Sequence, residues 1–330
     1  MEFADPMIVD GLRIDALKHV AKPFWPHIQS AANMYTLGEV FAQDYDTIDY
    51  ICNWQSVISG TFNYKLWYSM MTTFLNTTQS MSGLSVELSY LSAGCQDTTL
   101  LGTFTENHDV SRFAANVTDV TILQNAMTFS LLTDGIPVVY YGAEQELKGT
   151  GDPNNREALW LYGYNTSSVL YQHIKLVNTA RNAILNVSTF EYWSAYWTFK
   201  SKVISAQDDI LAIRRGFDQS IVAVVTNKGA DSANAGPYEL GDTNFIDGAT
   251  IVDLISCNTL IVGEYGVFNV TVTGGLPQVW LPASLLVNAT DVCPKVSRAA
   301  TSTSAATTNL VPSLSLFTAG LFLAACSLFT

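Results

Sequence analysis

The pattern of apolar and polar residues along the chain changes near residue 187. Before that point, runs typical of buried strands alternate with segments of helical apolar spacing. The strand-like runs lie at about 8–15, 34–41, 60–64, 100–107 and 136–141, and the helical spacing is found at 68–75, 122–132 and 166–186. Strands that alternate with helices predict a parallel sheet, with polar functional residues at the carboxyl ends of its strands.

After residue 187 the pattern is one of short alternating strands separated by Gly- and Asn-rich turns. The expected strands are Ile210–Arg214, Ser220–Val225, Ile251–Leu254 and Phe268–Val272. This spacing predicts a small antiparallel sandwich. We therefore expect an α/β catalytic domain over 1–186, an all-β domain over 187–295, and a terminal segment over 296–330.

The first strand-like run carries a charged pair. Arg13 and Asp15 are two residues apart, so both point to the same side of a strand. The guanidinium would keep the carboxylate ionised and in one rotamer, as a nucleophile requires. The alternative is an ordinary structural ion pair at a strand end.

Two further runs carry acids at comparable places. Glu39 is a lone carboxylate in the apolar stretch 37–41, where a raised pKa would suit a general acid. Another apolar strand ends in Glu106-Asn107-His108-Asp109. Each run alone is weak support, because apolar strands often end in polar loops, but the three in this order form a specific constellation.

With the motifs Asp10-Gly11-Leu12-Arg13-Ile14-Asp15, Gly38-Glu39-Val40 and Glu106-Asn107-His108-Asp109, the chain resembles the α-amylase family of glycoside hydrolases. It is most similar to the secreted fungal members, from near the N-terminus to about Cys293. The resemblance implies a (β/α)8 TIM barrel followed by a small antiparallel β-sandwich. It places the first motif at the end of the fourth barrel strand. We therefore expect an N-terminally truncated chain that lacks the first three strand–helix units and the inserted calcium-binding subdomain.

The resemblance also implies roles for the three acids in a retaining double displacement on α-1,4-glucans. Asp15 would be the nucleophile, and Glu39 would protonate the leaving oxygen and then deprotonate the acceptor. Asp109 would bind sugar hydroxyls and stabilise the oxocarbenium-like transition state. Retaining enzymes hold the two reacting carboxyl groups roughly 5 Å apart, and neighbouring strands have about this separation.

Further residues match substrate contacts of the family. Arg13 is expected to orient Asp15, and His108 to donate a hydrogen bond to the sugar in subsite −1. Asp152 and Arg156 match a substrate-clamping loop after the eighth strand.

The acceptor side and the metal are matched by two adjacent residues. Lys18 and His19 correspond to acceptor-side residues, with a solvated helix-start lysine as the alternative for Lys18. The backbone carbonyl of His19 corresponds to one calcium ligand, but calcium takes six to eight oxygens. We therefore expect calcium for a full-length parent and not from this chain alone. Glu106 is interpreted as structural.

Composition limits the possible partners and cofactors. The formal net charge of −13 over 330 residues argues against nucleic acid, whose phosphates would be repelled. The sequence has no Gly-rich phosphate loop and no CxxC pair, so we infer no nucleotide cofactor and no zinc site. The expected partner is an α-glucan, bound by a monomer.

Cysteines and glycosylation sequons indicate a secretory route. Cys326 lies in the apolar tail, and four cysteines remain, which allow three pairings by spacing alone. The resemblance implies the pairs Cys52–Cys95 and Cys257–Cys293. Six Asn-x-Ser/Thr sequons occur, at Asn76, Asn116, Asn165, Asn186, Asn269 and Asn288.

The two ends of the chain give different indications. Residues 1–6 have neither the basic nor the apolar region of a signal peptide. A small-residue spacer at 299–309 and an apolar tail at 310–330 have the layout of a glycosylphosphatidylinositol (GPI) attachment signal. A true tail anchor is the alternative. We expect an extracellular protein that is lipid-anchored at the plasma membrane or cell wall.

Departures from the family pattern leave two alternative functions. Phe41-Ala42-Gln43-Asp44 lacks the usual acidic residue and glycine of the acceptor region, and Val110-Ser111 replaces the common Asn-Pro after Asp109. These differences are compatible with a cell-wall 4-α-glucanotransferase that uses the same residues. A non-catalytic surface protein is the other alternative, because five strands of eight cannot close a barrel.

Overall fold

The computed structural model describes residues 9–41, 51–185, 187, 195–217, 220–286 and 292–296. Several features expected from the sequence lie outside these ranges. They are the lipid-attachment segment 299–330, the acceptor-region residues 42–44, and the sequons at Asn186 and Asn288.

All five strands expected before residue 187 are present, within the ranges expected for them. The first sheet is parallel and consists of β1 (Gly11–Ile14), β2 (Tyr35–Gly38) and β3 (Gly60–Thr61). The second is the parallel pair β4 (Gly102–Phe104) and β5 (Ile136–Val138). A parallel bridge between Phe62 and Gly102 connects the two sheets. The carboxyl ends of these strands therefore face the same side, as in a TIM barrel.

The helices fill the connections between the strands. They are α1 (Trp25–Ala32), α3 (Tyr64–Phe74), α4 (Ser82–Gly94), α5 (Val120–Leu132) and α6 (Val169–Leu185). Side-chain caps define two of the starts: Asn63 accepts a hydrogen bond from the Leu66 N–H, and Asp119 accepts one from the Thr121 N–H. Short 3₁₀ turns complete the connections: η1 (Leu17–His19), η2 (Lys22–Phe24), η3 (Asn53–Ser56), η4 (Thr98–Leu100), η5 (Phe113–Ala115), η6 (Ala143–Gln145), η7 (Leu159–Tyr162), η8 (Glu264–Gly266) and η9 (Ala283–Leu286).

The C-terminal domain is an antiparallel sandwich, as expected from the sequence. Its strands are β6 (Lys202–Ala206), β7 (Leu211–Arg215), β8 (Ile221–Val225), β9 (Ala235–Leu240), β10 (Thr250–Asp253), β11 (Thr259–Ile261), β12 (Phe268–Val272) and β13 (Gln278–Pro282). Six of them form a sheet in the order β11-β10-β13-β8-β7-β6, and β12 pairs with β9. The pattern of apolar residues had assigned only β7, β8, β10 and β12.

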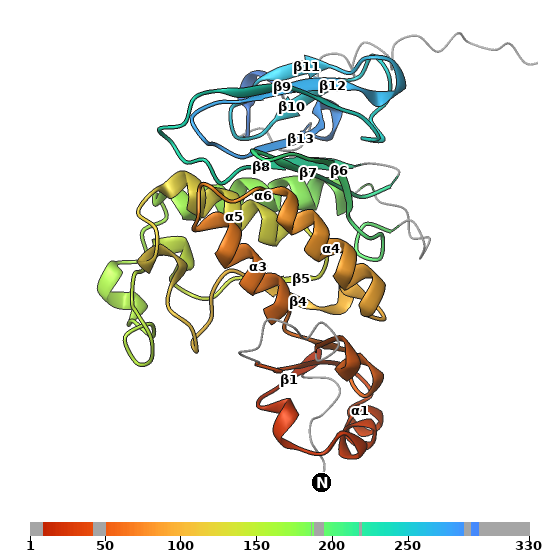
Figure 1. Ribbon diagram of the computed structural model, residues 1–330, viewed down its shortest axis with the longest axis vertical. Helices are drawn as coiled ribbons and strands as arrows, with labels where there is room; N and C mark the ends of the chain where they lie inside the picture. The colour runs from red at the N-terminus through yellow and green to blue at the C-terminus, as the bar shows by residue number, and fades with distance from the viewer. Residues whose placement is uncertain are drawn as a thin grey trace, which may run out of the picture.

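The large sheet is buried on both faces. On β7, Leu211 and Ile213 pack into the core shared with the helices, whereas Ala212 packs toward β9 and β12. Figure 1 shows this layering: β6, β7 and β8 lie across α4, α5 and α6, and β1 and α1 lie at the opposite end of the long axis. Because α5 is covered by the sheet, every residue from Thr121 to Leu132 is buried.

Polar contacts also join the two domains. Arg215 pairs with Asp134, with Nη1 2.6 Å from Oδ1. The buried Asn227 donates its amide N–H groups to the carbonyl oxygens of Thr73, Asn76 and Gln79 at 2.9–3.0 Å. The interface is therefore specified by hydrogen bonds as well as by apolar contact.

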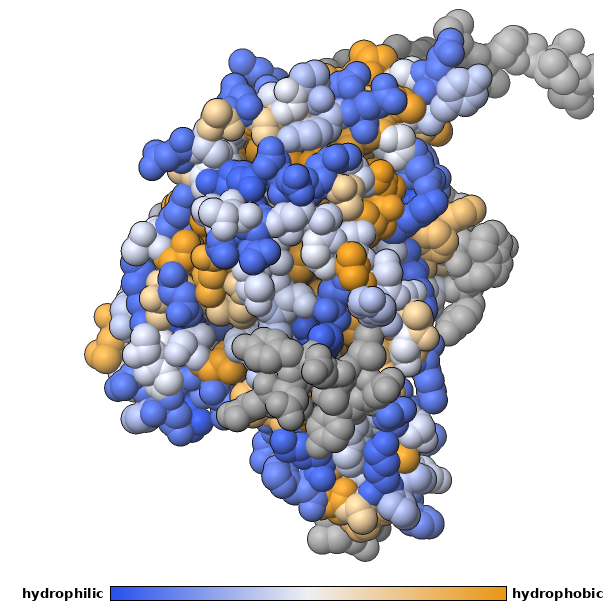
Figure 2. Space-filling view, viewed as in Figure 1, coloured by the Kyte–Doolittle hydropathy of each residue, from blue (hydrophilic) through white to orange (hydrophobic). Residues whose placement is uncertain are grey.

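Both disulfides implied by the resemblance are confirmed: Cys52 is bonded to Cys95, and Cys257 to Cys293. The face of the molecule seen in Figure 2 is mostly hydrophilic, with apolar side chains in small scattered groups. Among the residues that the structure describes, no helix is both long and apolar enough to cross a membrane.

Candidate active site

The strand ends surround an open cleft of about 610 Å³. All the candidate catalytic and binding residues except Arg13 line it. The lining residues are Asp15, Ala16, Lys18, His19, Glu39, Phe41, His108, Asp109, Asp152 and Arg156. Residues that are far apart in the chain thus converge at the edge of the sheet where polar side chains were expected.

Asp15 lies directly after β1, where the positive φ of Ala16 (48°) turns the chain. Its side chain is 73% exposed, and the Arg13 guanidinium donates a hydrogen bond to its Oδ1. This hydrogen bond and the positive charge of Arg13 lower the pKa of Asp15, and a side-chain hydrogen bond with Glu39 lowers it further. Asp15 is therefore held as a carboxylate facing the cleft, in the state that a nucleophile requires.

Glu39 lies at the same level on the neighbouring strand. Its N–H donates to the Ile14 carbonyl (2.8 Å), which continues the ladder between β1 and β2. Its Oε2 accepts a hydrogen bond from the Ala16 N–H (3.1 Å) and lies 3.5 Å from Arg13 Nη2. The Glu39 side chain is only 12% exposed, so the two carboxyl groups share Arg13 but differ in solvation.

Gly38 explains how Glu39 can come this close to β1. A Cβ at Gly38 would lie 2.5 Å from a methyl carbon of Leu17 and 2.6 Å from one of Ile58, both buried. Any side chain here would push β2 away from the turn that follows β1. The glycine of the Gly-Glu-Val motif is thus a packing requirement.

Asp109 comes from the loop after β4 and lines the same cleft. Its N–H donates to Asn107 Oδ1 (2.9 Å), and its carboxylate lies 3.3 Å from His108 Nε2 and 3.6 Å from Arg156 Nη2. The Asn107 amide in turn donates to the Tyr64 hydroxyl (2.8 Å). The third acid is thereby held in the cleft that Asp15 and Glu39 also line.

The loop after β5 supplies the remaining contacts. Arg156 lies 3.3 Å from Asp152 and also donates from Nε to the His108 carbonyl (3.2 Å). The Lys18 ammonium donates to the Phe41 carbonyl, which fixes it at the cleft wall. The cleft is thus lined by two basic groups and four carboxyl groups.

Sequence comparisons agree with this geometry. The α-amylase catalytic-domain family matches residues 3–186, and the α-amylase domain C family matches residues 203–301.

The chain belongs to the α-amylase family.

Alpha-amylase 2 of Schwanniomyces occidentalis is 41% identical over 85% of this chain and 53% of its own length. The α-amylase of Saccharomycopsis fibuligera is 40% identical over 88% of this chain and 56% of its own. The solved structure of an α-amylase from Malbranchea cinnamomea superposes with a TM-score of 0.79 at 35% identity, covering 86% of this chain and 58% of that one. This α-amylase-family chain therefore spans about half the length of the curated relatives that it matches.

The sequence alone did not single out Tyr64, which lines an adjoining cavity of about 180 Å³ together with Arg13, Phe62 and Phe104. Tyr64 begins α3 at the end of β3, and burial raises the pKa of its hydroxyl, so it remains protonated. Its position at the end of a strand-like run was the available signal, but a tyrosine there is also common in ordinary cores.

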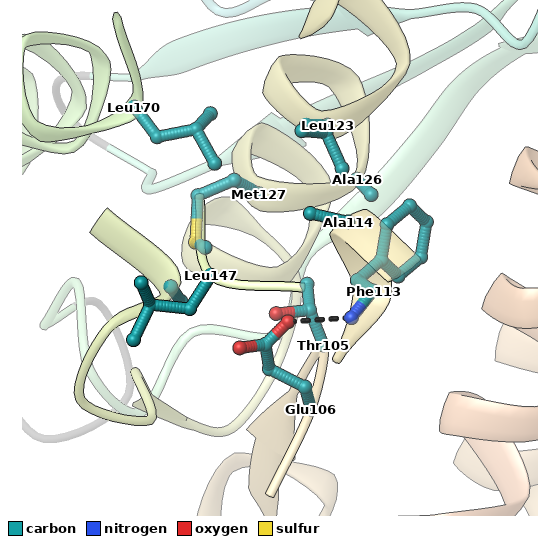
Figure 3. Close-up of a pocket in the computed structure, with 10 residues that line it drawn as sticks. Thr105, Glu106, Phe113, Ala114, Leu123, Ala126, Met127, Leu147 and Leu170 are labelled. Atoms are coloured by element: carbon teal, nitrogen blue, oxygen red, sulfur yellow. Dashed lines mark hydrogen bonds between the residues drawn. The ribbon is translucent and has the colours of Figure 1, made fainter. Parts of the chain in front are cut away.

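Glu106 does not line the cleft, although it borders the adjoining cavity with Arg13 and His108. It also borders a small cavity of about 10 Å³ whose other walls are largely apolar, shown in Figure 3. Its Oε2 accepts a hydrogen bond from the Phe113 N–H (2.7 Å), and its Oε1 accepts one from the buried Arg112 (2.9 Å). Burial raises the pKa of Glu106, whereas these hydrogen bonds oppose that change.

Members of this family generally depend on calcium. His19, whose backbone carbonyl the resemblance implies as one calcium ligand, lines the cleft. The described part of the chain brings no three His, Cys, Asp or Glu side chains together around a common point. One carbonyl falls far short of the six to eight oxygens that calcium takes. The described residues therefore do not form a calcium site.

Proposed function

We propose that this protein is a retaining α-amylase that hydrolyses internal α-1,4-glucosidic bonds in starch- or glycogen-type glucans. The observation that carries the proposal is the pair Asp15 and Glu39 on adjacent parallel strands, bridged by Arg13 and lining one cleft with Asp109. Relatives at 40–41% identity are named α-amylases, which favours hydrolysis over glucan transfer and over a non-catalytic role.

The reaction takes place in two displacements. In the first, the Asp15 carboxylate attacks the anomeric carbon while Glu39 gives its proton to the departing glycosidic oxygen. A covalent glycosyl ester forms, and the glucan segment on the acceptor side leaves with the proton. In the second, the Glu39 carboxylate takes a proton from water, the water oxygen attacks the anomeric carbon, and Asp15 is released. Two inversions give overall retention.

The remaining cleft residues hold the substrate in this cycle. Asp109 stabilises the positive charge that develops on the sugar ring, and His108 donates to a hydroxyl of the same ring. Asp152 and Arg156 hold the chain on the donor side, whereas Lys18 and His19 lie on the acceptor side. The carboxylates accept from sugar hydroxyls and the basic groups donate to them.

We also propose that the enzyme is a monomer with an extracellular site of action, and the disulfides and sequons support the extracellular part. Two disulfides persist in oxidising compartments. The four described sequon asparagines, Asn76, Asn116, Asn165 and Asn269, are all exposed. We infer that the small-residue spacer and apolar tail of the C-terminus direct lipid anchoring at the cell surface.

The test is release of reducing sugar from soluble starch by the parent protein and by Asp15→Asn and Glu39→Gln. Each variant removes one chemical step while keeping the side-chain shape. Loss of a positioned general acid costs about 10²–10⁴-fold in rate, so Glu39→Gln should lose at least that much kcat and Asp15→Asn no less. Asp231→Asn, at an exposed position in the C-terminal domain, is the matched control and should keep full activity.

Three outcomes would overturn the assignment. A parent protein without turnover on starch would refute the enzymatic function. With maltopentaose as substrate, products that are mainly longer than the substrate at low conversion would show a transferase. The anomer released first, followed by NMR, should be α, and a β-anomer would refute the double displacement.

A further inference from the structure

A buried asparagine that substrate cannot reach is hydrogen-bonded to the backbone segment that carries Asp109. Asn155 is fully buried in the loop after β5 and is absent from the cleft wall. Its Nδ2 donates to the carbonyl oxygens of His108 (2.9 Å) and Val110 (2.7 Å), the residues on either side of Asp109. Both partners are acceptors, so only the amino end of the amide can face them.

The next residue contacts the same segment from the cleft. Arg156 donates from Nε to the His108 carbonyl (3.2 Å), and its Nη2 lies 3.6 Å from Asp109 Oδ1. The backbone around Asp109 and its carboxylate are thus held by two consecutive residues of one loop. A shift of that loop would move the acid and its basic partner together.

The loop itself is anchored by an ion pair between the buried Arg112 and the partly buried Glu157. Arg112 is fully buried, and its Nε donates to Glu157 Oε2 (3.0 Å). The other oxygen of Glu157 accepts from the Gly149 N–H (2.6 Å), while the Arg112 N–H donates to the Gly149 carbonyl (3.0 Å). Gly149 and Glu157 flank the stretch that contains Asn155, so both ends of that stretch are fixed to the segment after β4.

We propose that Asn155 is a positioning residue for the glycosidase reaction, one that sets the distance of Asp109 from the pair Asp15 and Glu39. This inference rests on the proposed function. Transition-state stabilisation by a fixed carboxylate depends on its placement, and a displacement of about 1 Å can cost about 100-fold in rate. Substrate binding in the ground state relies on many cleft contacts and is less sensitive to Asp109 alone.

The chain offers a closely matched control in Asn227. It is also fully buried, its Nδ2 also donates only to backbone carbonyls, and its Oδ1, like that of Asn155, has no hydrogen-bond partner among the described residues. Asn227 connects the C-terminal domain to the α3–α4 region instead of the cleft. Removing either amide should cost comparable stability, so only a positioning role separates the two variants.

The experiment compares Asn155→Ala and Asn227→Ala for kcat and KM on starch, with thermal unfolding of each. We expect kcat of Asn155→Ala to fall about 10- to 100-fold with KM changed less than threefold, and kcat of Asn227→Ala to stay within twofold of the parent. The hydroxyl of Asn155→Ser can donate to one of the two carbonyls, so kcat of this variant should lie between those of Asn155→Ala and the parent. In Asn155→Ala, amide hydrogen exchange should quicken selectively over residues 107–111.

Three results would overturn the inference: an unchanged kcat in Asn155→Ala, an equal loss in the two alanine variants, or a loss confined to KM. If Asn155→Ala does not fold, Asn155→Ser at full parental kcat, without faster exchange over 107–111, overturns it equally. An inactive parent protein would instead refute the proposed function. In that case, faster amide hydrogen exchange over residues 107–111 in Asn155→Ala would still show that Asn155 stabilises the segment that carries Asp109.

Discussion

His173 should make the stability of the protein depend on pH between about pH 4 and pH 6.5. It lies on α6, and only 2% of it is exposed. Its Nε2 is 2.7 Å from the Thr128 hydroxyl and its Nδ1 is 3.4 Å from the Gln124 amide, both on α5. Burial lowers the pKa of His173 from 6.5 to about 4. The folded protein therefore keeps this imidazole neutral.

The sign and size follow from proton linkage. Below pH 6.5 the unfolded chain takes up a proton that the folded chain does not accept until about pH 4, so the free energy of unfolding falls as the pH falls. At 1.36 kcal/mol per pKa unit, the total loss is about 3 kcal/mol. Asp15, Asp119 and Asp242, whose pKa values are lowered below 3.8 in the fold, add their losses mainly at more acidic pH.

The assay is urea unfolding at half-unit steps from pH 7.5 to pH 4.5, for the parent and for His173→Gln. Glutamine can still hydrogen-bond to Thr128 but cannot take up a proton. For each protein the free energy of unfolding is plotted against pH. Only the difference between the two plots reports on His173, because every other titrating group is common to both proteins. Between pH 7 and pH 5 the parent should lose roughly 2 kcal/mol more than the variant. Parallel curves would refute the reasoning.

Two further changes test other parts of the structure. Arg13→Gln should move the acid limb of the pH profile of kcat/KM to higher pH, because the guanidinium that lowers the pKa of Asp15, the proposed nucleophile, is lost; an unshifted limb would contradict this role. Replacing Cys52 and Cys95 together by serine opens a loop of 43 residues and should lower the free energy of unfolding by about 4 kcal/mol at 25 °C. That value is measured by denaturant titration, and a loss below about 1 kcal/mol would show that the loop is constrained in the unfolded chain by other means.

The barrel strands and their acids could be predicted because their signals are local. In β1 the alternation of Leu12 and Ile14 with charged residues both marks a strand and places Arg13 beside Asp15. Glu39 follows a short strand whose glycine admits close packing. Because the strands are parallel, their carboxyl ends lie at the same edge of the sheet whatever the sequences of the loops that connect them.

The strands that escaped prediction depend on partners instead. β9 contains Gly236 and Pro237, which are unfavourable in a strand. It forms because β12 pairs along it and both cover the apolar face of the large sheet. The helix α4 was missed for a similar reason: Ser and Gly dilute its apolar pattern, and packing on α3 stabilises it.

Asn155 illustrates the same limit within the site. The sequence places it in a polar loop of seven residues, Gly151 to Glu157, where an asparagine is ordinary turn chemistry. Its significance arises from two carbonyl oxygens about 45 residues earlier in the chain. No spacing rule connects such positions, so only the folded arrangement shows the contact.

The charge of the cleft connects the site to its proposed substrate. Four acids and two strong bases line it, namely Asp15, Glu39, Asp109, Asp152, Lys18 and Arg156, within a chain of formal net charge −13. A polyanionic ligand would be repelled electrostatically as it approached this negatively charged protein. A neutral glucan does not, and its hydroxyls can donate to the carboxylates and accept from the bases. The acidic balance that argues against nucleic acid is thus compatible with the neutral glucan proposed as the substrate.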